Sequence, residues 1–250
     1  MAIRGTISLL VAAAAMAAAV ATANATAPAG GATTTAAGAT LTPAAFVAKY
    51  CGGATIDESV TVSAGAATVT GQCEVRLAND RGVTLTLARG ASLTATRRFR
   101  LKAASRTATD ATFAMNGGAT LRAEKIILGS RLRTLRVGAA TIESTNRRVV
   151  LTSFGSITLG RGAVVTSPTV GQTVTANRKV VVASRGSVTI ERGARVSSPL
   201  SALTVRGKSV DVQPGSTLEA GTSLWVTGLT RCTTAGAVVR GPTARRKICA

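Results

Sequence analysis

The side chains with the most regular placement in this sequence are basic residues that stand just before short apolar stretches. Five of them each directly precede a stretch in which apolar residues lie two apart or nearly so: Arg98, Lys125, Arg148, Lys179 and Lys208. Three of these are doubled by a preceding arginine: Arg97, Arg147 and Arg178. Guanidinium and ammonium groups held in a row bind the phosphate, sulfate or carboxylate groups of a polymer. The spacing therefore predicts a polyanion-binding column, provided that the fold stacks these positions.

Three further arginines, each directly before a recurring glycine, predict a second, broken column: Arg89, Arg161 and Arg192. The chain has 30 Lys and Arg against 10 Asp and Glu, a net charge of +20, and 24 of the basic residues are Arg. This balance favours contact with nucleic acid, lipopolysaccharide or acidic glycan. Solvated surface charge is the competing explanation, because basic residues at strand entries also discourage edge pairing.

Composition argues against several other kinds of site. The chain contains no His, which excludes Ser-His-Asp and Cys-His catalysis, and it has no Cys-x-x-Cys, so we expect no metal site. One Trp, one Tyr and four Phe are too few for a groove that stacks bases or sugar rings. Alignment of the repeats places Glu191 and Glu219 at equivalent positions, which predicts that they stack as a carboxylate pair. Such a pair would support sugar hydrolysis, which keeps a polysaccharide-active lyase or hydrolase as the alternative function.

A repeated unit indicates the fold that must position these residues. Its three clearest copies are R-V-V-L-T-S-F-G-S-I-T-L from Arg148, K-V-V-V-A-S-R-G-S-V-T-I from Lys179 and K-S-V-D-V-Q-P-G-S-T-L from Lys208. Each contains a Gly-Ser pair seven residues on, and the copies are 31 and 29 residues apart. Repetition at this period is typical of stacked units, and apolar residues two apart lie on one face of a strand. The repeat therefore predicts a β-solenoid.

A second motif interleaves with the first. It reads apolar-x-apolar, two residues, Gly, two residues, apolar, and it recurs around Gly90, Gly118, Gly162 and Gly193, with a frayed copy at Ala139 to Ile142 and a shortened one at Gly221. Glycine at such a position marks a bend with positive φ or a close backbone approach. The motifs together predict an all-β, single-domain parallel β-solenoid of about six or more coils over residues 57–230.

The two ends of the predicted solenoid carry features that could cap it. At residues 42–56, Thr42 and Pro43 start a predicted capping helix whose apolar face would cover the first coil. Residues 231–250 form a predicted C-terminal cap with a basic tail. The four cysteines fall into two local pairs, which we expect to form one disulfide at each end: Cys51 with Cys73, and Cys232 with Cys249.

The first 25 residues have the features of a secretory signal peptide. Arg4 precedes an apolar stretch from Ile7 to Val20, and Ala23-Asn24-Ala25 is a small-x-small cleavage site. A membrane anchor is the alternative for this stretch. Residues 26–41 are rich in Ala, Thr and Gly and are predicted to form a flexible linker. We therefore expect a secreted protein, whether periplasmic, cell-surface or extracellular.

The repeats quoted above resemble those of secreted bacterial right-handed parallel β-helix proteins of pectate-lyase-like architecture, over roughly residues 57–230. The resemblance implies a right-handed coil but selects no function, because lyases, hydrolases, adhesins and structural rods share this architecture. The expectation is an exported structural or adhesive solenoid of the cell envelope or extracellular space. It would be a non-enzymatic protein without cofactor that binds acidic glycan, lipopolysaccharide or DNA through its Arg/Lys column. Whether the rods associate end to end stays open.

Overall fold

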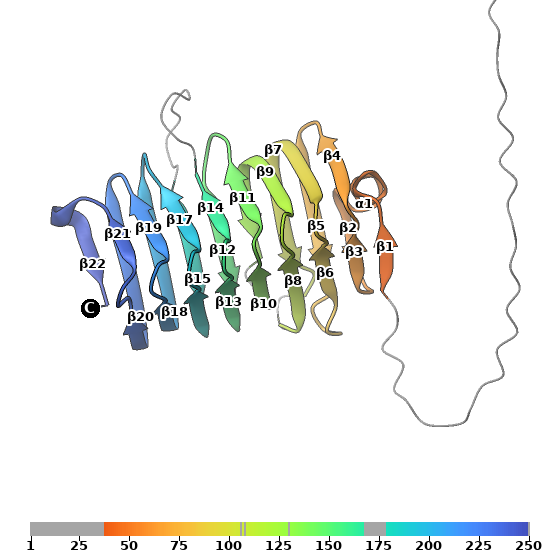
Figure 1. Cartoon of the computed structure of the whole chain (residues 1–250). Helices are drawn as coiled ribbons and strands as arrows, with labels where there is room; N and C mark the ends of the chain where they lie inside the picture. Colours follow the sequence, from red (N-terminus) through yellow and green to blue (C-terminus); the bar gives the residue numbers. More distant parts are fainter. Residues whose placement is uncertain (1–37, 106, 108, 130, 168–178, 250) are drawn as a thin grey trace, which may run out of the picture. The chain divides into compact units, whose positions relative to one another are not determined.

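The computed structural model describes residues 38–105, 107, 109–129, 131–167 and 179–249, and it confirms an all-β parallel solenoid. About nine turns follow one another along the chain, which agrees with the expected six or more (Figure 1). Every strand pairing between turns is parallel, and the pairings fall into three ladders. Each ladder forms one face of the solenoid, and we name each face after one of its central strands.

The β8 face contains nine rungs, beginning with β1 near the N-terminal end. Its strands are β1 (Ala39–Leu41), β3 (Val60–Val62), β6 (Thr84–Leu87), β8 (Ala111–Met115), β10 (Leu132–Val137), β13 (Ser156–Leu159), β16 (Ser187–Ile190) and the second parts of β18 (Ala202–Val212) and β20 (Ser223–Thr233).

The β11 face follows the β8 face along each turn. Its strands are β4 (Gly65–Val69), the first parts of β7 (Ala91–Ala103) and β9 (Thr120–Leu128), β11 (Thr141–Ser144), β14 (Val164–Thr166), β17 (Arg195–Ser198), β19 (Thr217–Ala220) and β21 (Val238–Arg240).

The β12 face completes each turn before the chain returns to the β8 face. Its strands are β2 (Gly52–Ile56), β5 (Gln72–Leu77), the second parts of β7 and β9, β12 (Val149–Ser153), β15 (Val180–Ser184), the first parts of β18 and β20, and β22 (Arg246–Ile248). A short 3₁₀ helix, η1 (Thr243–Arg245), precedes β22.

The core is a set of apolar columns that the parallel register stacks along the solenoid. On the β8 face one fully buried column runs through Leu85, Phe113, Leu135, Ile157, Val188 and Val210. Burying each such side chain stabilises the fold by roughly 1.5–3 kcal/mol. Alternating Ser and Thr point outward between them, as the sequence pattern predicts for strands with one buried face.

The corner between the β8 and β11 faces is turned by glycines, so we call it the glycine corner. Gly90, Gly118, Gly162 and Gly193 have φ of 74° to 76°, which confirms the bends that the second motif predicts. The shortened copy at Gly221 was a wrong assignment, because the left-handed glycine of that coil is Gly215, with φ of 75°. Val210, Val212 and Leu218 complete a full-length motif around Gly215, in register with the preceding coil.

The N-terminal cap agrees with the prediction in its helix but differs around it. Helix α1 (Pro43–Tyr50) begins after Thr42, whose Oγ1 accepts a hydrogen bond from the Ala45 N–H at 3.2 Å, and it buries Phe46 and Tyr50 against the first coils. The predicted cap extends to residue 56, yet residues 52–56 form β2, which pairs with β5. The end of the predicted linker, residues 39–41, is likewise strand β1. The first 37 residues, including the predicted signal peptide, lie outside the described residues.

Both predicted disulfides are present, one in the first coils and one in the last. Cys51 and Cys73 are neighbours in adjacent coils because β2 and β5 pair, so the 22-residue spacing is one turn. Cys232 and Cys249 join β20 to the segment after β22. Disulfides are typical of proteins from oxidising, extracellular environments. In the described part of the chain, no helix is both long and apolar enough to span a bilayer.

Candidate polyanion-binding surface

Four of the five predicted column residues stack at one corner of the solenoid. Arg98 pairs in register with Lys125, and Arg148 and Lys179 each stand directly before Val149 and Val180, which pair with each other. Val149 also pairs with Ile126, the residue after Lys125. Arg98, Lys125, Arg148 and Lys179 therefore occupy one position in four consecutive coils, where the chain leaves the β11 face and enters the β12 face. We call this set the basic column.

The stacking brings like charges close together. Equivalent backbone positions in adjacent parallel strands lie about 4.8 Å apart. At about 4 Å two unit charges in water repel each other by about 1 kcal/mol. Partial burial first, and then the positive charges of Arg148 and Arg98, lower the pKa of the Lys125 ammonium below its ordinary value. Repulsion within the column thus disfavours the charged form of Lys125. A bound anion would offset this repulsion and stabilise the charged form.

The basic column has no carboxylate partner within ion-pair distance among the described residues. The Arg98 guanidinium donates to the side-chain oxygen of Gln72 in the preceding coil. The Nε of Arg148 is buried and has no hydrogen-bond partner. Guanidinium groups without a carboxylate partner favour a bound oxyanion.

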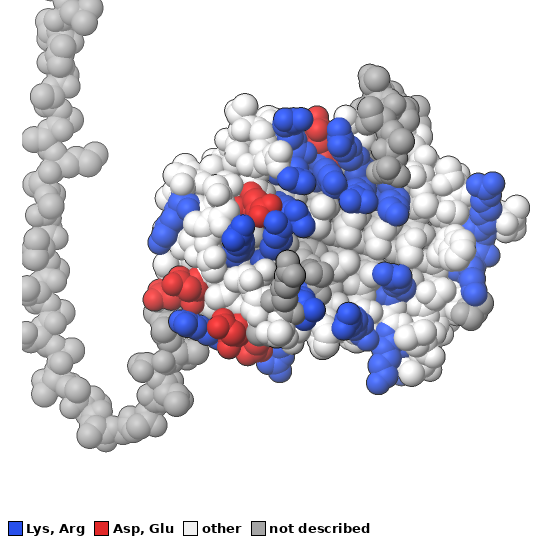
Figure 2. Space-filling model, turned by 180° about the vertical axis from the view of Figure 1, so that it is seen from behind, with Lys and Arg blue, Asp and Glu red and all other residues white. Residues whose placement is uncertain are grey.

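The exposed residues just before the column add to its charge. Arg97 and Arg147 are both exposed, and the Arg147 N–H donates to the carbonyl of Glu124 in the coil between them. The Glu124 side chain offsets part of this charge but forms no ion pair among the described residues. Figure 2 shows Lys and Arg side chains clustered at the upper edge of the solenoid beside an acidic side chain, with other basic side chains scattered over the same face. Arg178, the third predicted doubling residue, lies outside the described residues.

Lys208 does not belong to the basic column, so that prediction was wrong. Its N–H donates to the carbonyl of Gly186, and the next residue, Ser209, pairs with Ser187 on the β8 face. The repeat unit from Lys208 is therefore shifted by one face relative to the units from Arg148 and Lys179. In that coil Ala202 occupies the position of the basic column, because the next residue, Leu203, pairs with Val180.

The second predicted column is broken, as expected. Arg161 and Arg192 lie in consecutive coils at the glycine corner, since β13 and β16 pair. Arg89 lies three coils earlier, beyond β8 and β10. An acid interrupts this charge, because the Arg161 N–H donates to Oε2 of Glu191 at 3.0 Å. This set therefore lacks the continuous positive charge of the basic column.

The predicted carboxylate pair does not form. Glu191 lies at the glycine corner, where its coil equivalent is Gln213, whereas Glu219 lies on the β11 face opposite Ser197. Hydrogen bonds from Ser197 and Arg195, both at 3.0 Å, lower the pKa of Glu219. Glu219 is thus an ion-paired surface carboxylate. Among the described residues, no group of three or more Cys, Asp or Glu could hold a metal ion.

On the β12 face, the carboxylate of Glu74 is surrounded by basic side chains. Glu74 accepts a hydrogen bond from Lys102 at 2.6 Å and lies within 4 Å of Arg76 and Arg100. The Lys102 hydrogen bond, with help from the charges of Lys102, Arg100 and Arg76, lowers the pKa of Glu74 against the opposing effect of burial. Glu74 therefore balances one of these three positive charges within the protein.

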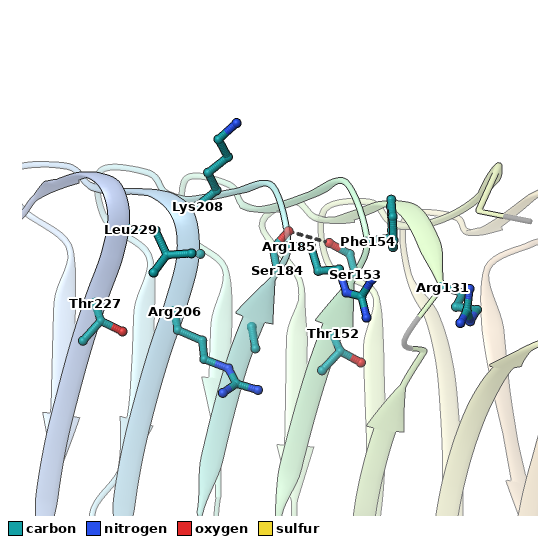
Figure 3. Close-up of a pocket in the computed structure, with 12 residues that line it drawn as sticks. Arg131, Thr152, Ser153, Phe154, Ser184, Arg185, Arg206, Lys208, Thr227 and Leu229 are labelled. Atoms are coloured by element: carbon teal, nitrogen blue, oxygen red, sulfur yellow. Dashed lines mark hydrogen bonds between the residues drawn. The ribbon is translucent and has the colours of Figure 1, made fainter. Parts of the chain in front are cut away.

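The sequence reasoning missed a second basic cluster, at the corner between the β12 and β8 faces. A groove of about 710 Å³ there is lined by Arg131, Arg185, Arg206 and Lys208 (Figure 3). The repeats did contain a signal, because alignment of the units from Arg148 and Lys179 places Phe154 and Arg185 at the same position. In the structure the Arg185 guanidinium lies over the Phe154 ring, 5.1 Å from its centroid.

Comparisons of the chain with protein-family models, with curated proteins and with solved structures found no match.

Proposed function

We propose that this protein is an exported structural or adhesive β-solenoid that binds a linear polyanion, such as acidic glycan, lipopolysaccharide or DNA, along its basic column. The observation that carries the proposal is the register of Arg98, Lys125, Arg148 and Lys179 in four consecutive coils, without ion-paired carboxylates among the described residues. A rigid solenoid fixes the spacing of these charges, so the protein loses little conformational entropy when a charged polymer binds.

The electrostatics explain why a polymer fits this surface better than a single small ion. One small anion neutralises one or two neighbouring charges, whereas a polymer with regular charge can relieve repulsion along the whole column and release its own counterions. Arginine, which contributes two column members and both described doubling residues, binds phosphate, sulfate and carboxylate through two parallel hydrogen bonds.

Export and the resemblance to right-handed parallel β-helix proteins belong to the same proposal. The signal-like residues 1–25 and the two disulfides support an extracellular or periplasmic location. We do not propose a polysaccharide-active enzyme, because the carboxylate pair on which that alternative rested lies at two different places in the fold.

Binding of heparin, duplex DNA and lipopolysaccharide to the purified protein tests the proposal. The column variant replaces Arg98, Lys125, Arg148 and Lys179 with Gln. The matched control variant also removes four positive charges, but on the β8 face and at the glycine corner: Arg89, Arg136, Arg161 and Arg192 to Gln. We expect at least one polyanion to bind the wild type and the control alike and to lose most of its affinity for the column variant. Equal loss in both variants would reduce the column to non-specific surface charge.

A further inference from the structure

The basic groove between the β12 and β8 faces combines positive charge with exposed apolar side chains, and the proposed polyanion column does not involve it. Its lining comes from Arg131 before β10, from the ends of β12 and β15 and from the middle of β18 and β20, so five coils build it. In Figure 3 Arg185 lies beside Phe154, Arg206 projects from the β12 face, and Lys208 extends outward at the rim. The volume of about 710 Å³ is within the range of roughly 300–1,000 Å³ that is usual for small-molecule sites.

The charges of this groove are uncompensated. Four basic residues and no acidic residue line it. None of Arg131, Arg185, Arg206 and Lys208 forms an ion pair with another described residue. Thr152 and Ser184 also line the groove, but their hydroxyls already donate to backbone carbonyls, so the basic side chains supply the donors for a ligand. Such a lining is complementary to an acidic group that accepts several hydrogen bonds.

Two exposed large apolar side chains lie in the lining of the same groove. Phe154 is 38% exposed and Leu229 is 89% exposed, and both line the groove. Trp225, which is 50% exposed, lies two residues before the lining residue Thr227 on β20, so both side chains point outward from the same face. Single exposed apolar residues need no explanation, but two in the lining of one basic groove, with Trp225 two residues along the strand, indicate an apolar portion in its ligand.

The groove is also elongated. A neighbouring hollow of about 460 Å³ shares Arg131 and Thr152 with it and continues along the β12 face past Ile127 to Lys102. A ligand with a head and a chain would fit along this path, with its head at Arg185 and Arg206 and its chain extending toward Ile127.

We propose that this groove binds an anionic amphiphile: a molecule with one phosphate, sulfate or carboxylate head and an acyl or alkyl chain. The head contacts Arg185 and Arg206, and the chain packs against Phe154 and extends toward the neighbouring hollow. This site is separate from the basic column, so either proposal can fail without the other.

The single tryptophan of the chain, Trp225, provides a direct readout because it adjoins the groove. The full chain is titrated, below the micelle concentration of each probe, with dodecyl phosphate, inorganic phosphate and the neutral amphiphile dodecyl maltoside. We expect dodecyl phosphate to shift the Trp225 emission to shorter wavelength and to bind more tightly than either other probe. The double variant Arg185→Gln/Arg206→Gln should weaken its binding by about tenfold or more, because charged hydrogen bonds are lost.

Two controls decide between the possible origins of binding. The double variant Arg161→Gln/Arg192→Gln removes the same charge at the glycine corner and should bind dodecyl phosphate like the wild type. Phe154→Ala, at a partly exposed position, should weaken dodecyl phosphate more than inorganic phosphate. The proposal is overturned if dodecyl maltoside binds as tightly as dodecyl phosphate, if inorganic phosphate binds equally well, or if the glycine-corner variant loses as much affinity as the groove variant. Circular dichroism verifies that each variant keeps its β structure.

Discussion

The salt dependence of polyanion binding should report the number of basic-column residues in contact with the polymer. Each protein charge that neutralises a duplex phosphate contributes about −0.9 to the slope of log K against log salt, and about −0.7 for a single strand. Replacing the four column residues with Gln should therefore make the slope shallower by about 3 to 4 for duplex DNA. Between about 50 and 200 mM salt, the wild type should lose roughly a hundredfold more affinity than the column variant.

A salt series with fluorescently labelled duplex DNA measures both slopes by anisotropy. The control variant, with Arg89, Arg136, Arg161 and Arg192 changed to Gln, has the same net charge as the column variant and should keep nearly the wild-type slope. The reasoning is refuted if the two variants have equal slopes, because the slope would then follow net charge and not the column. A slope change near 1 would mean that the polymer contacts a single member of the column.

Three further predictions concern the scaffold. Replacing both Cys51 and Cys73 with Ala should lower the free energy of unfolding by about 3 kcal/mol, as expected for a disulfide that closes a loop of this length. Denaturant titration measures this loss. An unchanged free energy would mean that the first coils are stable without the disulfide. Gly186→Ala should destabilise by more than about 1 kcal/mol, because its Cβ would lie 2.0 Å from the carbonyl oxygen of the equivalent glycine one coil away. Gly52→Ala, whose Cβ meets nothing within 4 Å, is the control, and equal melting temperatures for the two variants would contradict the close-packed corner. Because the folded-state pKa of Glu74 is depressed, its contribution is present above the ordinary value of 4.5 and is lost as the pH falls below it. Glu74→Gln should therefore flatten the fall of the melting temperature below this pH, and an unchanged profile would exclude Glu74 as its source.

Periodicity alone was sufficient to predict the architecture, because each coil repeats the same demands. Apolar residues two apart form the buried face of each strand. The glycine at the corner before the β11 face must adopt positive φ. The capping helix was predictable for a local reason, since Thr42 and Pro43 are the residues that a helix start favours. The disulfide partners followed from the two local pairs of cysteines, one near each end of the solenoid, and the Cys51 to Cys73 spacing also equals one coil.

The register of individual residues was less predictable. The units from Lys179 and Lys208 look alike, yet the second is shifted by one face, and the Gly-Ser pair at Gly186 turns a different corner from the pair at Gly215. A basic residue before an apolar stretch can enter any of the three faces, so sequence could not assign Lys208. The repeats carried a signal only for the stacking of Arg185 on Phe154. The rest of the groove was not predictable, because Arg131, Arg185 and Arg206 come from three coils and from different places in the repeat.

The most direct test of the central claim is the pKa of the Lys125 side chain, measured by NMR with and without a saturating polyanion. In the free protein, burial and the neighbouring Arg148 and Arg98 hold this pKa below its ordinary value. Heparin seated on the column would supply negative charge next to the ammonium group, so the pKa should rise on binding. If heparin binds and the pKa of Lys125 stays where it was, the polyanion lies elsewhere on the protein and the account of the basic column is wrong.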